Sequence, residues 1–374
     1  MKIWIVTTSY PRQPGESINA GVVVRDLALD FAQRGHEVSV FTPAKPGLTR
    51  FDPEVRGVLI PWLRPSIALA DLNVSNPMDA TRAASLMLRG SRLVRREAQH
   101  RPPDGIVAVW GLPSGMFART AAAVSGAPYC VWLLGSDVWR ASRFPAGVTM
   151  LRRVIRDSRA TFANSHDLAH RAMRITGQRV GYLPAIRRLP DGAGSGPNTD
   201  LVYVGRLHPN KGVDVLIEAM GLLRRSGLTP RTLIYGSGAL QQSLQHRIDA
   251  LTLGGTVHLR GPIEAGPLAD QLRASRFLVL PSRVDSTPLV LGDAIQARLP
   301  VVATDVGDTG GLVRRFRLGE VVAADNPQAL SDGIRRALSG AASAPFGWPD
   351  WEGAAQLMTP HLAFQRFSEA LALG

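Results

Sequence analysis

The regular alternation of short apolar runs with stretches of helical period is the feature that most constrains the fold of this chain. Such runs are typical of buried strands, and a strand followed by a helix is the repeating unit of a parallel sheet. Thirteen strands are too many for one eight-stranded barrel, so the pattern predicts an α/β fold with two doubly wound, Rossmann-like sheets. The expected strands lie over 3–7, 37–41, 55–60, 105–110, 129–133, 160–163 and 180–183, then over 201–204, 231–235, 257–259, 277–280, 301–303 and 320–322.

A tract rich in glycine and proline separates the two series of strands. Pro184 is followed by Pro190-Asp191-Gly192-Ala193-Gly194-Ser195-Gly196-Pro197, which is typical of a linker. We therefore predict an N-terminal domain over 1–186 and a C-terminal domain over 187–355. An amphipathic helix predicted from Gln356 to Leu373 would pack back on the N-terminal domain, which would then include 356–374. Ligands bind at the carboxyl ends of the strands in doubly wound sheets, so the predicted site is a cleft between the domains.

The composition excludes several classes of protein. Hydrophobic residues make up 45% of the 374 residues and charged residues 20%, which rules out extended disorder. The single cysteine, Cys130, lies in an apolar run; it excludes a disulfide scaffold, and we expect an inert buried thiol. No run approaches 18 apolar residues, and the run from Ile3 to Val6 is too short for a signal peptide, so we expect a cytoplasmic protein.

The positive charge is confined to one half of the chain. Residues 1–190 carry 26 Lys and Arg against 13 Asp and Glu, whereas residues 191–374 carry 17 of each. This asymmetry predicts a basic face with an anionic partner: a phospholipid membrane surface, a diphosphate-bearing acceptor or a polyanion. The stretches 87–96 and 150–159 mix apolar residues with arginines at helical spacing, which fits a solvated helix face or an interfacial membrane contact. Nucleic acid is not expected, because no aromatic platform accompanies the charge.

The strongest motif runs from Tyr203 to Ala219. It predicts a strand that ends at Val204, a loop that carries Gly205, Arg206 and Lys211, and a helix that begins near Gly212. Two cations at the end of a strand suit a diphosphate, because the loss of a nucleoside diphosphate requires its growing negative charge to be stabilised. These cations and backbone N–H groups can do this without a metal ion, so we predict no cofactor and no metal.

A second motif follows the strand predicted over 277–280. Ser286 or Thr287 can cap a helix whose first turn contains Pro288, so that free N–H groups point at an anion or a hydroxyl group. Asp285 precedes this helix and Asp293 follows two turns later. Both acids can therefore face one ligand at different depths, one holding sugar hydroxyls and the other ribose hydroxyls.

Together these motifs resemble the retaining GT-B glycosyltransferases of the GT4 family. The resemblance rests on the Gly205-Arg206-Leu207 loop with Lys211-Gly212, on the two acids with Pro300-Val301-Val302-Ala303-Thr304 after them, and on the Gly236-Ser237-Gly238 turn. In the first half it includes a helix opened by Asn19-Ala20-Gly21, with Asn19 as its cap, and closed by Arg34-Gly35-His36, as well as Gly135-Ser136-Asp137 and Ala163-Asn164-Ser165.

The resemblance implies roles for residues of this chain. Arg206 and Lys211 would hold the diphosphate and Asp285 would contact the transferred sugar, which makes these three the predicted catalytic residues. Gly135 and Asp137 would lie on the acceptor side. The predicted donor-binding residues are Gly21 near the phosphates, Asp293 at the ribose, and Gly205, Gly236, Gly238, Ser286, Thr287, Leu289 and Val290.

The chain departs from the family pattern at three places. Asp285 and Asp293 stand where the family usually has glutamates, Leu134 stands where it usually has a histidine, and an acid often found near Gly311 is absent. The predicted function is transfer of a sugar, with retention, from a nucleotide-diphosphate sugar to a lipid-linked or glycan acceptor in bacterial cell-surface polysaccharide or glycolipid assembly, with natural-product glycosylation left open. The departures leave a degenerate, non-catalytic sugar-nucleotide-binding or assembly protein as the alternative.

Two further motifs are weaker. His166 and His170 with Asp167 between them imitate a zinc-binding helix, but the usual glutamate base and a third ligand are lacking. Gly236-Ser237-Gly238 lacks the third glycine of a dinucleotide-binding fingerprint. We therefore do not expect a metallohydrolase or a dehydrogenase.

Overall fold

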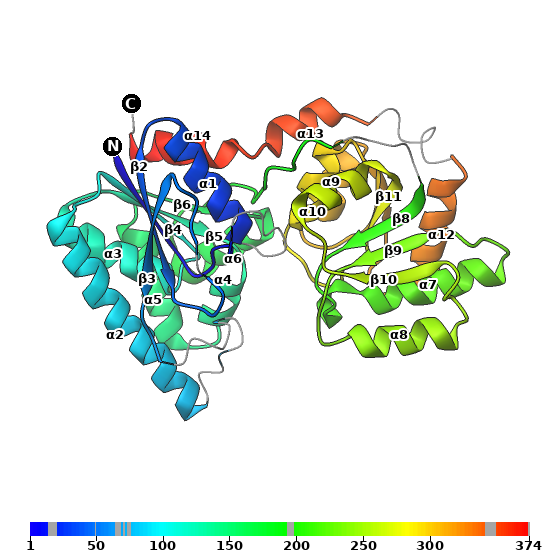
Figure 1. Ribbon diagram of the computed structural model, residues 1–374, viewed down its shortest axis with the longest axis horizontal. Coiled ribbons are helices and arrows are strands. Elements are labelled where there is room, and N and C mark those ends of the chain that lie inside the picture. Colours follow the sequence, from blue (N-terminus) through cyan, green and yellow to red (C-terminus); the bar gives the residue numbers. More distant parts are fainter. Residues whose placement is uncertain are drawn as a thin grey trace. The chain divides into compact units, whose positions relative to one another are not determined.

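The computed structural model describes residues 1–13, 21–48, 50–63, 69, 72, 76–192, 198–340 and 349–372. The chain forms two compact units: unit 1 is Met1–Ala185 with Pro360–Gly374, and unit 2 is Ile186–Thr359. Each unit contains one sheet whose strand pairs are parallel, with helices packed against it (Figure 1). All thirteen predicted strands are present, so the α/β prediction with two doubly wound sheets is confirmed.

Unit 1 has a seven-stranded sheet in the order β3-β2-β1-β4-β5-β6-β7. The chain therefore reverses direction across the sheet between β1 and β4, whose adjacent carboxyl ends are where ligands of such folds bind. The strands are β1 (Lys2–Thr7), β2 (Glu37–Pro43), β3 (Val55–Ile60), β4 (Gly105–Val109), β5 (Tyr129–Leu133), β6 (Ala160–Ala163) and β7 (Gly181–Tyr182). The helices are α1 (Gly21–Gln33), α2 (Pro77–His100), α3 (Ser114–Ser125), α4 (Ser136–Ala141), α5 (Pro145–Asp157), α6 (His166–Thr176) and α14 (Leu362–Leu371).

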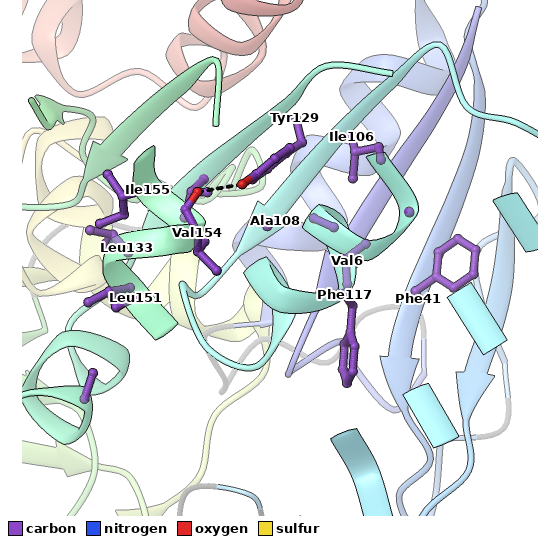
Figure 2. Packing of buried hydrophobic residues seen from close by; sticks show 14 of the residues in the cluster. Val6, Phe41, Ile106, Ala108, Phe117, Tyr129, Leu133, Leu151, Val154 and Ile155 are labelled. Carbon is purple, nitrogen blue, oxygen red and sulfur yellow. Dashed lines mark hydrogen bonds between the residues drawn. The ribbon is translucent and has the colours of Figure 1, made fainter. Parts of the chain in front are cut away.

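The core of unit 1 lies between the sheet and the helices α2, α3, α5 and α6. Figure 2 shows Phe117 of α3 and Val154 of α5 packed among the strand residues. The Tyr129 hydroxyl is buried there and donates to the Val154 carbonyl at 2.7 Å, so its polar atom is satisfied. Cys130 is buried in β5, and burial raises the pKa of its thiol to about 12, so it stays protonated at neutral pH.

The helix predicted over 356–373 is wrong in its first turns. The structure has two helices here, α13 (Trp351–Leu357), which contacts α10 (Leu289–Gln296) of unit 2, and α14, which contacts α1, β4 and β5 of unit 1. Pro360 lies between them and lacks the N–H group that an uninterrupted helix would need. On α14, the centroid of the Phe364 ring lies 5.0 Å from that of Phe31, and His361, the residue before α14, lies 3.3 Å from the Asp30 carboxylate.

Unit 2 has a six-stranded sheet in the order β10-β9-β8-β11-β12-β13. One core lies between the sheet and α9, α10, α11 and α13, and a second between the sheet and α7, α8 and α12. The strands are β8 (Thr199–Val204), β9 (Thr232–Tyr235), β10 (Val257–Gly261), β11 (Ser275–Leu280), β12 (Val301–Thr304) and β13 (Gly319–Val322). The remaining helices are α7 (Val213–Arg225), α8 (Gln241–Ala250), α9 (Ala265–Arg273), α11 (Thr309–Arg315) and α12 (Pro327–Leu338).

The described part of the predicted linker, and the residues just before it, pack on unit 2. Ile186 and Leu189 are buried in a core of unit 2, and the Arg273 guanidinium donates to the Pro190 carbonyl at 3.2 Å. Residues up to Gly192 therefore pack on unit 2, whereas 193–197 lie outside the described residues, as does the predicted cap Asn19. None of the helices described is both long enough and apolar enough to span a bilayer.

Candidate functional site

Four loops meet at the carboxyl ends of adjacent strands in unit 2, after β8, β9, β11 and β12. Glycines allow the backbones of these loops to lie in contact. A Cβ atom added to Gly236 would lie 1.8 Å from the Gly205 carbonyl oxygen, and one added to Gly212 would lie 1.9 Å from the Pro281 carbonyl oxygen. A Cβ atom added to Gly238 would likewise lie 2.2 Å from the Leu207 carbonyl oxygen. Gly205, Gly236 and Gly238, predicted as donor-binding residues, thus lie together, and Gly236 and Gly238 are required by contacts between backbones.

The structure brings together two of the three predicted catalytic residues. The Lys211 ammonium forms an ion pair with the Asp285 carboxylate, which also accepts from the Ser282 hydroxyl at 3.3 Å and from the Ser286 N–H at 3.1 Å. The side chains of Lys211 and Asp285 are 20% and 13% exposed, so both groups remain accessible to a ligand. The pair joins the loop after β8 to the loop after β11.

Arg206, the third predicted catalytic residue, is exposed on the same loop as Lys211. Within the described part of the chain its guanidinium has no hydrogen bond or ion pair. The pKa of the neighbouring Tyr203 lies above its ordinary value. Burial and the charge of Asp285 raise this pKa, and the charge of Arg206 opposes them only in part. The Tyr203 hydroxyl also donates to the Arg206 carbonyl at 3.0 Å, so the backbone of Arg206 lies beside this phenol.

Arg283 holds the loop that carries Lys211 and was missed by the sequence analysis. Its guanidinium donates to both carboxylate oxygens of Asp214 at 2.8 and 2.6 Å, to the Pro209 carbonyl at 2.8 Å and to Asp325 at 2.6 Å. The backbone N–H of Arg283 donates to the Asn210 carbonyl at 2.8 Å. Burial would raise the pKa of Asp214, but the hydrogen bonds and charge of Arg283 bring that pKa below its ordinary value.

The helix α10 begins differently from the prediction. Pro288 is the residue before the first helical turn, with φ −68° and ψ 136°, and no side chain caps the helix. The prediction that Ser286 or Thr287 caps is therefore wrong, because the extended Pro288 separates both side chains from the first N–H groups. Among the described residues, the N–H groups of Leu289 and Val290 donate to no backbone carbonyl, and the buried Thr287 hydroxyl has no partner. These donors suit an anion or a hydroxyl group.

The two acids of the motif contact different cations. Asp293 is completely buried on α10, and its carboxylate is paired with the guanidinium of Arg187. Asp285 is paired with Lys211 on the loop before the helix. That Asp293 contacts a ribose stays a prediction.

The predicted site residues of unit 1 lie at the carboxyl end of its sheet. Gly21 is the buried first residue of α1, and Gly135, at φ 115°, precedes α4. The buried Asp137 carboxylate accepts from the N–H groups of Gly111 at 2.6 Å and Gly135 at 2.9 Å. Burial raises the pKa of Asp137, and the N–H groups oppose this only in part. Asp137 thus ties the loop after β4 to the loop after β5.

Neither histidine of the zinc-like motif takes part in a metal cluster. Across the described ranges, no three His, Cys, Asp or Glu side chains lie close enough to hold an ion. His166 instead stacks on Tyr182, with ring centroids 4.1 Å apart and planes 14° from parallel.

One face of α2 carries an exposed group of arginines, Arg89, Arg92, Arg95 and Arg96, which we call the α2 basic face. Both acids of this helix are already paired, Asp79 with Arg82 and Glu97 with Arg56. Leu88 and Met78 of the same helix are 60% and 56% exposed. The α2 basic face therefore combines unneutralised charge with apolar surface.

Comparisons with known proteins agree with this arrangement. Residues 20–185 match the glycosyl transferase 4-like domain, and residues 198–340 match the glycosyl transferases group 1 family. TuaC of Bacillus subtilis, named for teichuronic acid biosynthesis as a glycosyltransferase, is 26% identical over 367 residues, covering 90% of this chain and 89% of that protein. A D-inositol 3-phosphate glycosyltransferase of Paenarthrobacter aurescens is 33% identical over 138 residues, covering 36% of this chain and 34% of that protein.

Solved structures with the same fold include sucrose-phosphate synthase from Thermosynechococcus elongatus, with a TM-score of 0.79 at 18% identity and 100% coverage of both chains. HepE of Anabaena in complex with UDP has a TM-score of 0.73 at 17% identity, again with 100% coverage of both chains. These neighbours confirm the GT-B fold. Because each half of the sequence matches a glycosyltransferase domain, and the two motifs of unit 2 converge at one edge of its sheet, this chain belongs to the GT4-type glycosyltransferases.

Proposed function

We propose that this glycosyltransferase moves a sugar from a nucleotide-diphosphate sugar to an acceptor hydroxyl, with retention and without a metal ion. The observation that carries the proposal is the accessible Lys211–Asp285 pair beside the first turn of α10. A cation, a carboxylate and free N–H groups at one sheet edge provide partners for a diphosphate and for sugar hydroxyls.

The chemistry assigns a task to each group. As the bond to the diphosphate breaks, negative charge grows on the leaving oxygen, and Lys211 and Arg206 stabilise it as fixed cations. The N–H groups of Leu289 and Val290 add hydrogen-bond donors at a helix N-terminus. Asp285, held by Lys211 and Ser282, accepts hydrogen bonds from the transferred sugar. Two cations and a helix N-terminus supply the charge stabilisation that a divalent ion would otherwise provide.

The relatives guide the choice of substrates. HepE of Anabaena was solved with UDP and with UDP-glucose, so uridine nucleotides are the first donors to test. TuaC is named for teichuronic acid biosynthesis, which favours a glycan of the cell surface as acceptor. All of the excess positive charge lies in residues 1–190, so we place an anionic or lipid-linked acceptor on unit 1.

The α2 basic face gives unit 1 a contact for an anionic membrane. Four arginines with the exposed Leu88 next to Arg89 combine electrostatic attraction with apolar insertion. We expect binding to vesicles that contain anionic lipid, weakening as salt rises, and loss of this binding when Arg89, Arg92, Arg95 and Arg96 are replaced by Ala. Salt-independent or absent binding would return these arginines to an ordinary solvated face.

A non-catalytic sugar-nucleotide-binding protein is the second candidate. This candidate is favoured by the buried ion pair between Arg187 and Asp293, because Asp293 is one of the two acids predicted to contact the donor. Both candidates bind nucleotides, so turnover separates them.

The test has two stages, both in EDTA. Thermal unfolding is measured with UDP, GDP, ADP, dTDP and CDP; a ligand at about 100 times its dissociation constant adds about 2.7 kcal/mol of apparent stability. Release of the nucleotide from its sugar conjugates is then measured, and NMR of the product gives the anomeric configuration. Nucleotide release with a retained anomer supports the proposal. Binding without release supports the second candidate, and no stabilisation by any nucleotide contradicts both.

A further inference from the structure

One side of α10 is covered by the first residues of unit 2. Gly292 lies against Ile186, so that a Cβ atom on this glycine would be 2.7 Å from the end of the isoleucine side chain. One turn later, the Gln296 side chain donates to the Arg187 carbonyl at 2.9 Å and accepts from the Leu189 N–H at 3.0 Å. Gln296 thus pairs with the backbone of 187–189 as a neighbouring strand would.

The ion pair between Arg187 and Asp293 lies on this same side. The Arg187 Nε donates to both carboxylate oxygens of Asp293, at 2.8 and 3.0 Å, and its Nη2 also donates to Oδ2. The side chains are 8% and 0% exposed. A planar guanidinium fork that donates to both oxygens of a carboxylate is a strong and directional geometry for two side chains of opposite charge.

We propose that Arg187 is a positioning residue of the donor site, and that Asp293 acts through Arg187 instead of binding the ribose. Arg187, Asp293 and Gln296, with Ile186 and Gly292 in contact, form what we call the α10 latch. It fixes the helix whose first N–H groups and preceding Asp285 face the donor. This inference rests on the proposed function, because it concerns the same donor site.

The charges decide against a ribose contact. Asp293 has no exposed surface and both of its oxygens already accept from Arg187, so a ribose hydroxyl could reach it only if Arg187 moved away, which would leave a buried guanidinium without its counter-charge. The position along the helix agrees, because Gly292, Asp293 and Gln296 all contact the segment 186–189. Asp285, in contrast, is paired with Lys211 on the loop before α10 and keeps an exposed fraction of 13%.

The first experiment measures thermal unfolding of Arg187→Ala, Asp293→Asn and the double variant. A latch predicts that each single change lowers Tm and that the double change lowers it no further than the worse single change, because both remove one interaction. Additive losses, or none, would contradict it. Arg187→Lys and Gln296→Ala are the milder variants if the others do not fold, and Arg188→Ala, at the exposed neighbour, is the control.

The second experiment measures the affinities for UDP and 2′-deoxy-UDP by calorimetry, and likewise for GDP and 2′-deoxy-GDP. If the α10 latch positions the helix, Arg187→Lys and Asp293→Asn weaken the binding of a nucleotide and of its 2′-deoxy analogue by the same factor, about tenfold. The reason is that misplacement of α10 affects every contact that the helix makes with the nucleotide. The ratio of the affinity for the nucleotide to the affinity for its 2′-deoxy analogue stays within twofold of the wild-type ratio. Arg187→Lys raises KM for the donor more than it lowers kcat.

Loss of the preference for the 2′-hydroxyl in Asp293→Asn alone, with Arg187→Lys unaffected, would assign Asp293 to the ribose and overturn the proposal. If the wild-type protein binds no nucleotide, the proposed function fails, and the unfolding cycle still decides whether the latch exists. The two failures are therefore distinguishable.

Discussion

Unit 2 contains two ion pairs built from the two acids of one motif, and their surroundings differ. Lys211 and Asp285 join two loops and remain 20% and 13% exposed, whereas Arg187 and Asp293 are 8% and 0% exposed on the inner side of α10. A partly solvated pair can exchange its partners for those of a ligand, but a buried pair cannot do so without leaving charges unpaired. Burial thus distinguishes Asp285, a candidate for the chemistry, from Asp293, a candidate for a structural role, although the two acids are only eight positions apart.

The largest expected effect concerns the stability of the buried pair. Asp293→Ala should lower the free energy of unfolding by about 3–5 kcal/mol, because it leaves the Arg187 guanidinium buried without a counter-charge. Replacing both residues together, Arg187→Met with Asp293→Leu, should cost much less, since no charge then remains. Urea denaturation measures both, and equal losses in the single and double variants would contradict the account.

A smaller effect is expected on turnover when the Lys211 loop is loosened. Arg283→Ala removes the bonds to Asp214, to Asp325 and to the Pro209 carbonyl, so we expect kcat/KM to fall about tenfold through misplacement of Lys211. Asp325→Asn is the matched control, because Asp325 is 64% exposed and accepts from the Arg283 Nε, whereas Asp214 accepts from both terminal nitrogens. The comparison fails if both variants behave alike.

The stability of Lys211→Ala sharpens the contrast with the buried pair. Removing one partner of a partly exposed pair should change the free energy of unfolding by about 1 kcal/mol or less. A loss comparable with that of Asp293→Ala would show that both pairs are structural. The same denaturation experiment decides this.

The smallest effect is a dependence on pH. Folding lowers the pKa of Asp214 below its ordinary value of 3.8, so between the two pKa values the unfolded chain binds more protons than the folded one. The stabilisation from Asp214 is therefore complete above about pH 3.8 and declines as the pH falls below that value. The stability difference between wild type and Asp214→Asn should shrink between pH 5 and pH 3, and a difference that grows instead would contradict this assignment.

Several elements could be predicted because their cause is local. A strand buried on both faces produces a continuous apolar run, which is why β5 was predicted at its observed bounds. The break at Pro360 was equally visible in the sequence but was overlooked. The glycines at 236 and 238 were predicted only as donor-binding residues, because their contacts with Gly205 and Leu207 require knowledge of which loops are neighbours.

The partners of the charged site residues could not be predicted. Arg187 pairs with a residue 106 positions away and Arg283 with one 69 positions away, and neither stands in a pattern that names its partner. Forty arginines in one chain offer many candidates for each acid. Only the fold, which brings the first residues of unit 2 onto α10 and the loop after β11 onto that after β8, selects the pairs.

The role of Lys211 in catalysis is tested by the turnover of Lys211→Ala, followed as nucleotide released from a sugar nucleotide in EDTA. We expect kcat to fall about 100-fold or more with the fold intact, because one preorganised donor at a developing negative charge contributes about 2.7–4 kcal/mol to catalysis. An unchanged kcat would contradict this expectation and would remove the Lys211–Asp285 pair from the mechanism.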